Sequence, residues 1–116
     1  MKQLSMKDLN KANPLEKTFE TKMVKKIKQM FPDCYEIPKP MMPSSRGTPD
    51  RMFVINGKFI AIETKRAKNS KTAQAQVLRM ESINKAGGHC CIAKDWETVE
   101  NLLIDAGLIV RLHNNY

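Results

Sequence analysis

The sequence lacks any apolar run close to the roughly 18 residues that a membrane-spanning helix needs. It also lacks, near its start, the continuous apolar stretch of a secretory signal. Cysteine is scarce: the chain has three, and two of them, Cys90 and Cys91, are adjacent. This spacing suits neither a disulfide framework nor a Cys-x-x-Cys metal site. We therefore expect reduced thiols in a cytoplasmic protein.

Acidic side chains are few relative to basic ones. The chain has 20 Lys and Arg residues against 12 Asp and Glu residues, and its pI is near 9.6. Residues 1–90 hold 18 of the basic and eight of the acidic side chains, so the excess is localised. A basic surface favours a polyanion, because phosphates attract Lys and Arg regardless of sequence. A merely solvated surface would have the same composition, and charge alone does not separate the two.

A chain of 116 residues has room for one domain, which we place at residues 14–116 after an N-terminal arm at 1–13. Apolar spacing, Gly, Pro and the Asn56-Gly57 dipeptide predict the elements. In order, these are a helix at 16–31 opened by Pro14, a strand at 34–37, a hairpin of strands 51–55 and 58–64, a helix at 72–86, a strand at 89–93, a helix between Asp95 and Gly107, and a strand at 108–112.

The fold class that follows is α/β with a mixed sheet. The elements after the hairpin form strand-helix-strand crossovers, which normally give parallel pairings. Both faces of the hairpin are apolar, as expected where helices cover both sides of a sheet. In the second long helix, the residues expected on one apolar face are Ala73, Val77, Met80, Ile83 and Ala86.

The hairpin register brings charged residues together. A two-residue turn at Asn56-Gly57 places Asp50 directly across from Glu63, where like charges are destabilising. Lys65 lies two residues beyond Glu63 and shares its face, whereas the Thr64 side chain is expected to point the other way. A salt-bridged trio on the rim of the sheet is the simpler interpretation. We favour a Mg²⁺ site instead, because Mg²⁺ is typically held by one or two carboxylates, and the Thr64 carbonyl could add a ligand.

Such a site would suit phosphodiester hydrolysis, with Lys65 orienting the attacking water or stabilising the transition state. Three segments together resemble the VRR-NUC (virus-type replication-repair nuclease) family: Gly47-Thr48-Pro49-Asp50, Glu63-Thr64-Lys65, and the pattern Gln76-x-x-x-Met80-x-x-Ile83-x-x-x-Gly87 that starts within the helix at 72–86. This family belongs to the PD-(D/E)-x-K superfamily, and the resemblance, over about residues 14–98, is greatest to its stand-alone phage members.

The resemblance implies a restriction-endonuclease-like core of order α-β-β-β-α-β, followed here by a helix and a strand. It implies an endonuclease dependent on Mg²⁺ or Mn²⁺, with Asp50 and Glu63 as metal ligands, Lys65 as the catalytic lysine and Gln76 supporting the site. Gln74 is the substitute if the helix register differs. The family also places a glutamate on the first helix, for which Glu16 is preferred and Glu20 is the alternative.

The expected substrate is DNA, and branched DNA or four-way junctions in particular, because stand-alone phage members of the resembling family are associated with junction cleavage. The basic residues expected to hold the phosphate backbone are Arg46, Arg51, Arg66, Lys68 and Lys71. Two cuts in symmetric strands would suit a homodimer, with Met6, Met41 and Met42 as candidate contacts. A noncatalytic DNA-binding module and an RNA-directed nuclease are the alternatives.

Overall fold

The computed structural model describes residues 14–39, 49–64 and 70–111, and of residues 14–17, 70 and 72 it describes the backbone alone. The elements follow the expected order through the last helix. They are α2 (Pro14–Met30), β1 (Tyr35–Ile37), β2 (Arg51–Ile55), β3 (Lys58–Glu63), α3 (Ser70–Lys85), β4 (His89–Ile92) and α4 (Trp96–Asp105). The expected arm at 1–13 lies outside the described residues.

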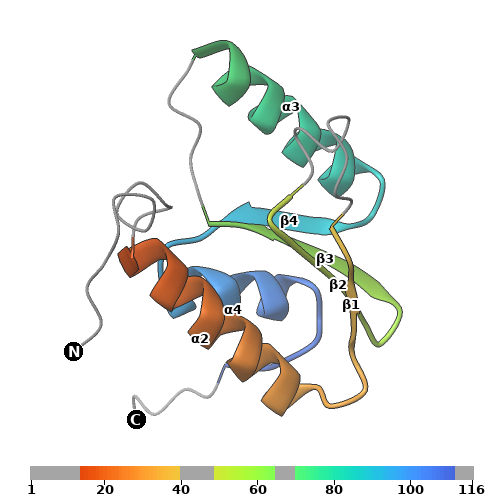
Figure 1. Ribbon diagram of the computed structural model, residues 1–116. Helices are drawn as coiled ribbons and strands as arrows, with labels where there is room; N and C mark the ends of the chain where they lie inside the picture. The colour runs from red at the N-terminus through yellow and green to blue at the C-terminus, as the bar shows by residue number, and fades with distance from the viewer. Residues whose placement is uncertain (1–13, 40–48, 65–69, 112–116) are drawn as a thin grey trace, which may run out of the picture.

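The four strands form one mixed sheet in the order β1-β2-β3-β4. Strands β1, β2 and β3 run antiparallel, and β4 pairs with β3 in parallel. Helices α2 and α4 cover one face, and α3 lies on the other (Figure 1). The mixed α/β prediction is therefore confirmed. No helix in the described part of the chain is long and apolar enough to cross a membrane.

The turn between β2 and β3 sets the register of the sheet. Asn56 and Gly57 both have positive φ, 49° and 81°, as a type I′ hairpin turn requires. The pairing runs from Ile55 with Lys58 to Arg51 with Ile62, which confirms the predicted register. One further step along the same ladder would align Asp50 with Glu63.

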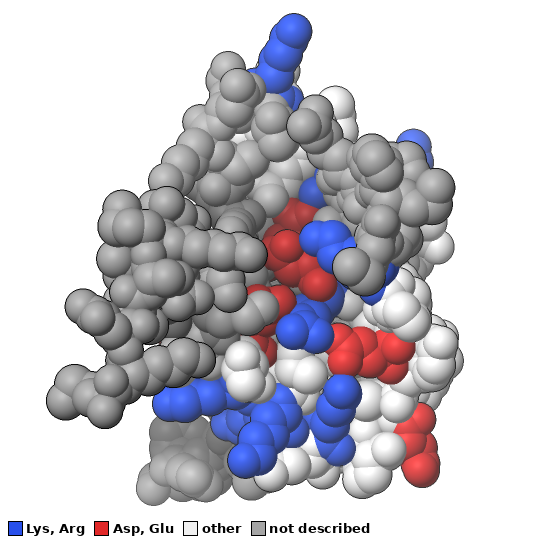
Figure 2. Space-filling view, in the orientation of Figure 1, with Lys and Arg blue, Asp and Glu red and all other residues white. Residues whose placement is uncertain are grey.

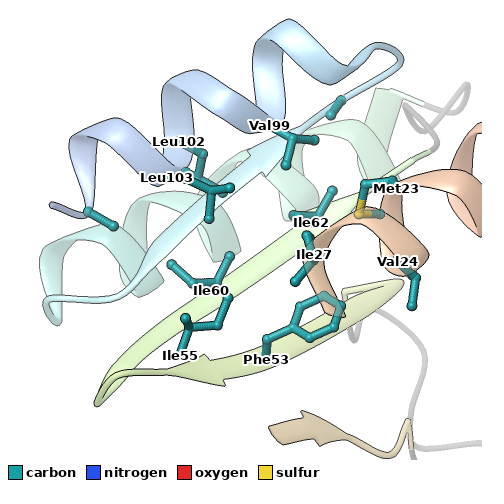
Figure 3. Close-up of a cluster of buried hydrophobic side chains, with 12 residues drawn as sticks. Met23, Val24, Ile27, Phe53, Ile55, Ile60, Ile62, Val99, Leu102 and Leu103 are labelled. Carbon is teal, nitrogen blue, oxygen red and sulfur yellow. The ribbon is translucent and has the colours of Figure 1, made fainter. Parts of the chain in front are cut away.

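The core lies between the sheet and helices α2 and α4 (Figure 3). Hairpin residues Phe53, Ile55, Ile60 and Ile62, together with Ile27 of α2, are fully buried there. They pack with the α4 residues Val99, Leu102 and Leu103. Asp95 caps α4 as predicted, since its side chain accepts a 2.9 Å hydrogen bond from the Thr98 N–H. Apolar packing therefore fixes both helices on this face of the sheet.

In the C-terminal half, one prediction holds only in part and another is wrong. Of the predicted apolar face of α3, Ala73, Met80 and Ile83 are half-buried. Val77 and Ala86 are exposed, so the buried side of α3 is turned away from them and toward Gln76. The expected strand at 108–112 does not form over the described residues Leu108–Arg111. Leu108 and Ile109 instead pack against the helical side of the core after the turn at Gly107, so they are covered without pairing in the sheet.

Candidate functional site

Asp50 and Glu63 lie at the end of the hairpin that is away from its turn. Glu63 is the last residue of β3, and Asp50 immediately precedes β2. Asp50 Oδ2 accepts hydrogen bonds from the Thr64 N–H at 2.8 Å and from the Thr64 hydroxyl at 3.1 Å. The hydroxyl thus reaches Asp50, contrary to the expectation that the Thr64 side chain points away. These two bonds hold the Asp50 carboxylate beside the end of β3.

The Glu63 carboxylate is buried, with 3% of the residue exposed. One oxygen, Oε1, accepts a hydrogen bond from Nη2 of Arg79, with which it forms an ion pair. The other oxygen, Oε2, is buried and has no hydrogen-bond partner among the residues that the structure describes. A buried carboxylate oxygen without a partner is costly. It is therefore a candidate ligand for a cation.

Helix α3 places two polar side chains on the Glu63 side of the sheet. Gln76 is buried with 7% exposure, whereas Gln74 is exposed, so the helix register favours Gln76 as predicted. Arg79 follows Gln76 by three residues and thus lies on the same side of the helix. Sequence reasoning assigned no role to Arg79. Its spacing from Gln76 is the signal that could have identified it.

Asp50 also has a basic neighbour, Lys39, which sequence reasoning missed. Lys39 Nζ lies 3.6 Å from Asp50 Oδ1, and about half of the lysine side chain is exposed. The Asp50 side chain is itself partly exposed, at 28%. Asp50 is therefore reachable from solvent, whereas Glu63 lies deeper, and the two carboxylates mark the outer and inner sides of one site.

On the opposite face of the sheet, Arg51 joins helix α2 to strand β1. Its Nε lies 2.9 Å from Glu20 Oε1 and its Nη1 lies 2.7 Å from Glu36 Oε2, and Lys28 Nζ is 2.9 Å from Glu36 Oε1. Burial raises the pKa of Glu36, but hydrogen bonds from Lys28 and Arg51 outweigh it and leave the pKa below its ordinary value. We call Arg51, Glu20, Glu36 and Lys28 the helix clamp.

The helix clamp bears on two predicted site residues. Glu20, the alternative metal ligand, is bonded to Arg51, and Arg51, a predicted phosphate contact, is bonded to two carboxylates. Burial lowers the pKa of Arg51, but hydrogen bonds to Glu36 and Glu20 outweigh it and leave the pKa above its ordinary value, so the guanidinium stays charged. Of the two predicted acids of the first helix, Glu20 is therefore already engaged by Arg51. Glu16 lies in α2, but its side chain is outside the described residues.

Most of the predicted phosphate contacts fall outside the described residues. These are Arg46, Arg66 and Lys68, and the predicted catalytic residue Lys65 lies outside them as well. Lys71 is exposed in the first turn of α3. Lys and Arg side chains also gather over helix α2 in the lower part of Figure 2, and acidic and basic side chains alternate in the middle of this view.

The cysteines do not add to the donor set. Burial first, and the charge of Glu63 second, raise the pKa of the Cys90 thiol to about 11, although Arg79 lowers it. Burial and Cys90 raise the pKa of Cys91 to about 12. Both thiols are therefore protonated at neutral pH. Like Cys34, neither forms a disulfide. Reduced thiols are what the sequence predicted.

A divalent cation fits the described donors in kind, although they are few. Over residues 14–39, 49–64 and 70–111, no three His, Cys, Asp or Glu side chains gather as a metal site. Asp50 and Glu63 nevertheless offer hard carboxylate oxygens, one of them without a partner. Mg²⁺ commonly takes only one or two protein carboxylates and completes its shell with water and substrate phosphate.

Comparison of the chain with protein-family models, with curated proteins and with solved structures gave no match.

Proposed function

We propose that the protein is a nuclease that hydrolyses DNA phosphodiester bonds with the help of Mg²⁺ or Mn²⁺. The observation that carries the proposal is the buried Glu63 carboxylate, which has an oxygen without a partner and ends the strand beside which Asp50 is held. A purely structural ion pair would satisfy both oxygens of such a group. The restriction-endonuclease-like core and VRR-NUC membership belong to the same proposal, and the order α2-β1-β2-β3-α3-β4 supports them.

The residues would divide the work as follows. Asp50, Glu63 and the Thr64 carbonyl would hold the cation, with Glu16 as a further ligand from helix α2. When bound, the cation would supply an acidified water and neutralise charge on the scissile phosphate. Lys65, which directly follows Thr64, would orient the attacking water or stabilise the charge that develops on the phosphate. Gln76 would support the site from α3.

The substrate in this proposal is DNA, and branched DNA in particular. Basic residues on either side of the carboxylates would hold the phosphate backbone, and Lys71 is the one of them that is exposed in the described structure. Arg51 is better suited to the helix clamp than to a phosphate, because it already bonds two carboxylates. Cutting both strands of a junction would require two active sites, which a homodimer supplies. The proposed location is the cytoplasm.

One observation favours a different function. Arg79 already neutralises Glu63, as it would in a noncatalytic DNA-binding module that keeps the fold without binding a cation. The two functions differ in what they predict for DNA. A module would bind DNA in every metal and in EDTA and would leave it intact.

Cleavage assays separate these possibilities. Purified protein is incubated with labelled linear duplex, flap, splayed-arm and four-way-junction DNA, and with RNA of matched sequence, in Mg²⁺, Mn²⁺ or EDTA. We expect cleavage of DNA in the presence of either metal and none in EDTA. The matched control is Asp50→Asn, which removes a charge from the site and little from the basic surface. Cleavage in EDTA, or equal cleavage by this variant, would contradict the proposal.

A further inference from the structure

The ion pair between Glu63 and Arg79 is incomplete on both sides. The two side chains meet through one pair of atoms, Arg79 Nη2 and Glu63 Oε1. Glu63 Oε2 and Arg79 Nε are both buried, and within the described residues neither has a hydrogen-bond partner. The Glu63 side chain is 4% exposed and that of Arg79 is 25% exposed. Two unsatisfied atoms therefore lie within one pair of residues.

This incompleteness is informative because arginine and carboxylate side chains frequently pair through two parallel hydrogen bonds. A pair retained for stability alone gains from that geometry, since each buried unsatisfied atom carries a desolvation cost. Here Arg79 supplies charge to Glu63 while leaving its second oxygen open. The pair is therefore suited to hold a carboxylate that must also accept something else.

We infer that Arg79 is a positioning residue that serves as the counter-cation of Glu63 until a divalent cation binds at Oε2. The inference depends on the proposed function, because it assumes that Glu63 is a metal ligand. Arg79 neutralises the buried carboxylate and holds it in place in the metal-free protein. Its positive charge also opposes the incoming cation, because like charges repel strongly in a partly buried site.

The two roles have opposite consequences when the charge of Arg79 is removed. The metal-free protein loses stability, because the buried Glu63 is left without a counter-cation. The affinity for the cation rises, because the repulsion is gone and the cation becomes the sole neutralising charge. An arginine that only packs the helix would lower stability without raising metal affinity.

The test measures folding and metal binding on the full chain, without DNA. Arg79→Met and Arg79→Gln remove the charge, Arg79→Lys keeps it, and Lys85→Met removes a charge from the exposed end of the same helix as a matched control. Thermal melting is recorded in EDTA and with Mn²⁺, and Mn²⁺ affinity is measured by calorimetry. Glu63→Gln and the double variant Glu63→Gln with Arg79→Met complete a double-mutant cycle.

We expect both neutral variants to melt well below the wild type in EDTA and to bind Mn²⁺ about tenfold more tightly, ~1.4 kcal/mol. Arg79→Lys should restore most of the wild-type melting temperature, and Lys85→Met should change neither property. With Gln at position 63, removing Arg79 should cost little further stability. A neutral variant that folds only with Mn²⁺ would be the extreme form of the expected result.

Equal or weaker Mn²⁺ binding by the neutral variants would overturn the inference, as would their failure to fold at saturating Mn²⁺. The failure of the proposed function has a different signature. If the wild-type chain binds no Mn²⁺, the metal site is wrong, and the counter-cation role falls with it. If the wild type binds Mn²⁺ and the neutral variants match it, the metal site stands and Arg79 has only a structural role.

Discussion

Replacing Glu20 by Gln tests which acid of helix α2 belongs to the site. Glu20 accepts a 2.9 Å hydrogen bond from Arg51 Nε, and its side chain is 14% exposed. Hydrogen bonds to charged groups contribute roughly 1.5–3 kcal/mol to stability. Gln keeps one acceptor oxygen but loses the charge, and Arg51 keeps Glu36. We therefore expect Glu20→Gln to lower the free energy of unfolding by about 1–2 kcal/mol.

The measurement is urea unfolding in EDTA, followed by Mn²⁺ titration of the folded variants. A change in midpoint at constant slope reports a loss of stability without a change in the surface exposed on unfolding. Glu81→Gln is the matched control, since Glu81 is an exposed acid on α3 outside the helix clamp. We expect Glu20→Gln to lose stability and to keep its Mn²⁺ affinity, and Glu16→Gln to do the reverse.

The result that would refute this reasoning is specific. If Glu20→Gln unfolds at the wild-type midpoint and binds Mn²⁺ more weakly, Glu20 is the ligand from the first helix. The ion pair between Glu20 and Arg51 would then contribute no stability to the metal-free protein. Mild and equal effects of the two substitutions on Mn²⁺ affinity would mean that α2 contributes no ligand.

Three further predictions concern the site, the pH response and the assembly. Asp50→Asn and Glu63→Gln should each abolish cleavage while DNA affinity in gel-shift assays stays within about twofold, because neither removes a basic side chain; activity in both would disprove the site. Lys65→Ala should also abolish cleavage but preserve metal binding, because this lysine would serve the water or the transition state rather than the cation. The stability that Glu36 contributes is complete above the pKa of its unfolded carboxyl, 4.5, and is lost as pH falls through the lower pKa of the folded state. In Glu36→Gln, the urea unfolding midpoint should therefore fall less steeply with pH below 4.5 than in the wild type. An unchanged pH profile would contradict this. Light scattering should give a mass of about twice 13.3 kDa, as expected for a homodimer. Leu78→Asp should reduce this mass, because Leu78 is an apolar side chain on α3 that is 62% exposed and could pack against a second copy. A strict monomer with and without junction DNA would reject the dimer.

The register of the hairpin could be predicted because local chemistry determines it. Asn56 and Gly57 adopt positive φ at little cost, so the turn has two residues and the pairing on either side follows by counting. The closeness of Asp50 to the end of β3 is a direct consequence. Helix ends were predictable for the same reason, since Asp95 and the Gly residues after α3 and α4 act on their own neighbours.

The orientation of helix α3 could not be predicted, because its apolar residues compete with its site-facing polar residues. The apolar pattern includes Val77, yet Val77 is 50% exposed while Gln76 is buried. Periodicity assumes that the apolar stripe faces the sheet. Here the sheet itself presents Glu63 to the helix, so Arg79 turns inward to meet it. The spacing of Arg79 from Gln76 places both on one side of the helix, but the sequence of the helix alone does not show that this side meets Glu63.

The prediction of a final strand at 108–112 was wrong for a related reason. Leu108, Ile109 and Val110 have the composition of a strand, but composition indicates an extended apolar segment and not its hydrogen-bond partner. In the structure, Leu108 and Ile109 contact the core, and Val110 is 85% exposed. The Leu108 N–H bonds back to the Leu103 carbonyl at 2.9 Å, which closes the end of α4 and redirects the chain.

The helix clamp and the candidate site are linked through Asp50 and Arg51, the residue before β2 and the first residue of β2. Asp50 and Arg51 are adjacent, and adjacent residues in extended chain point to opposite faces of a sheet. Asp50 is held at the end of β3, and Arg51 binds Glu20 and Glu36 on the α2 side. The position of α2 relative to the carboxylates is therefore fixed through a single peptide link. Because Glu16 precedes Glu20 by about one helical turn, the clamp sets where a ligand from α2 would lie, although no clamp residue needs to touch the cation. The bond from Arg51 to Glu36 keeps part of the clamp when Glu20 is replaced, so Glu20→Gln should leave that position in place.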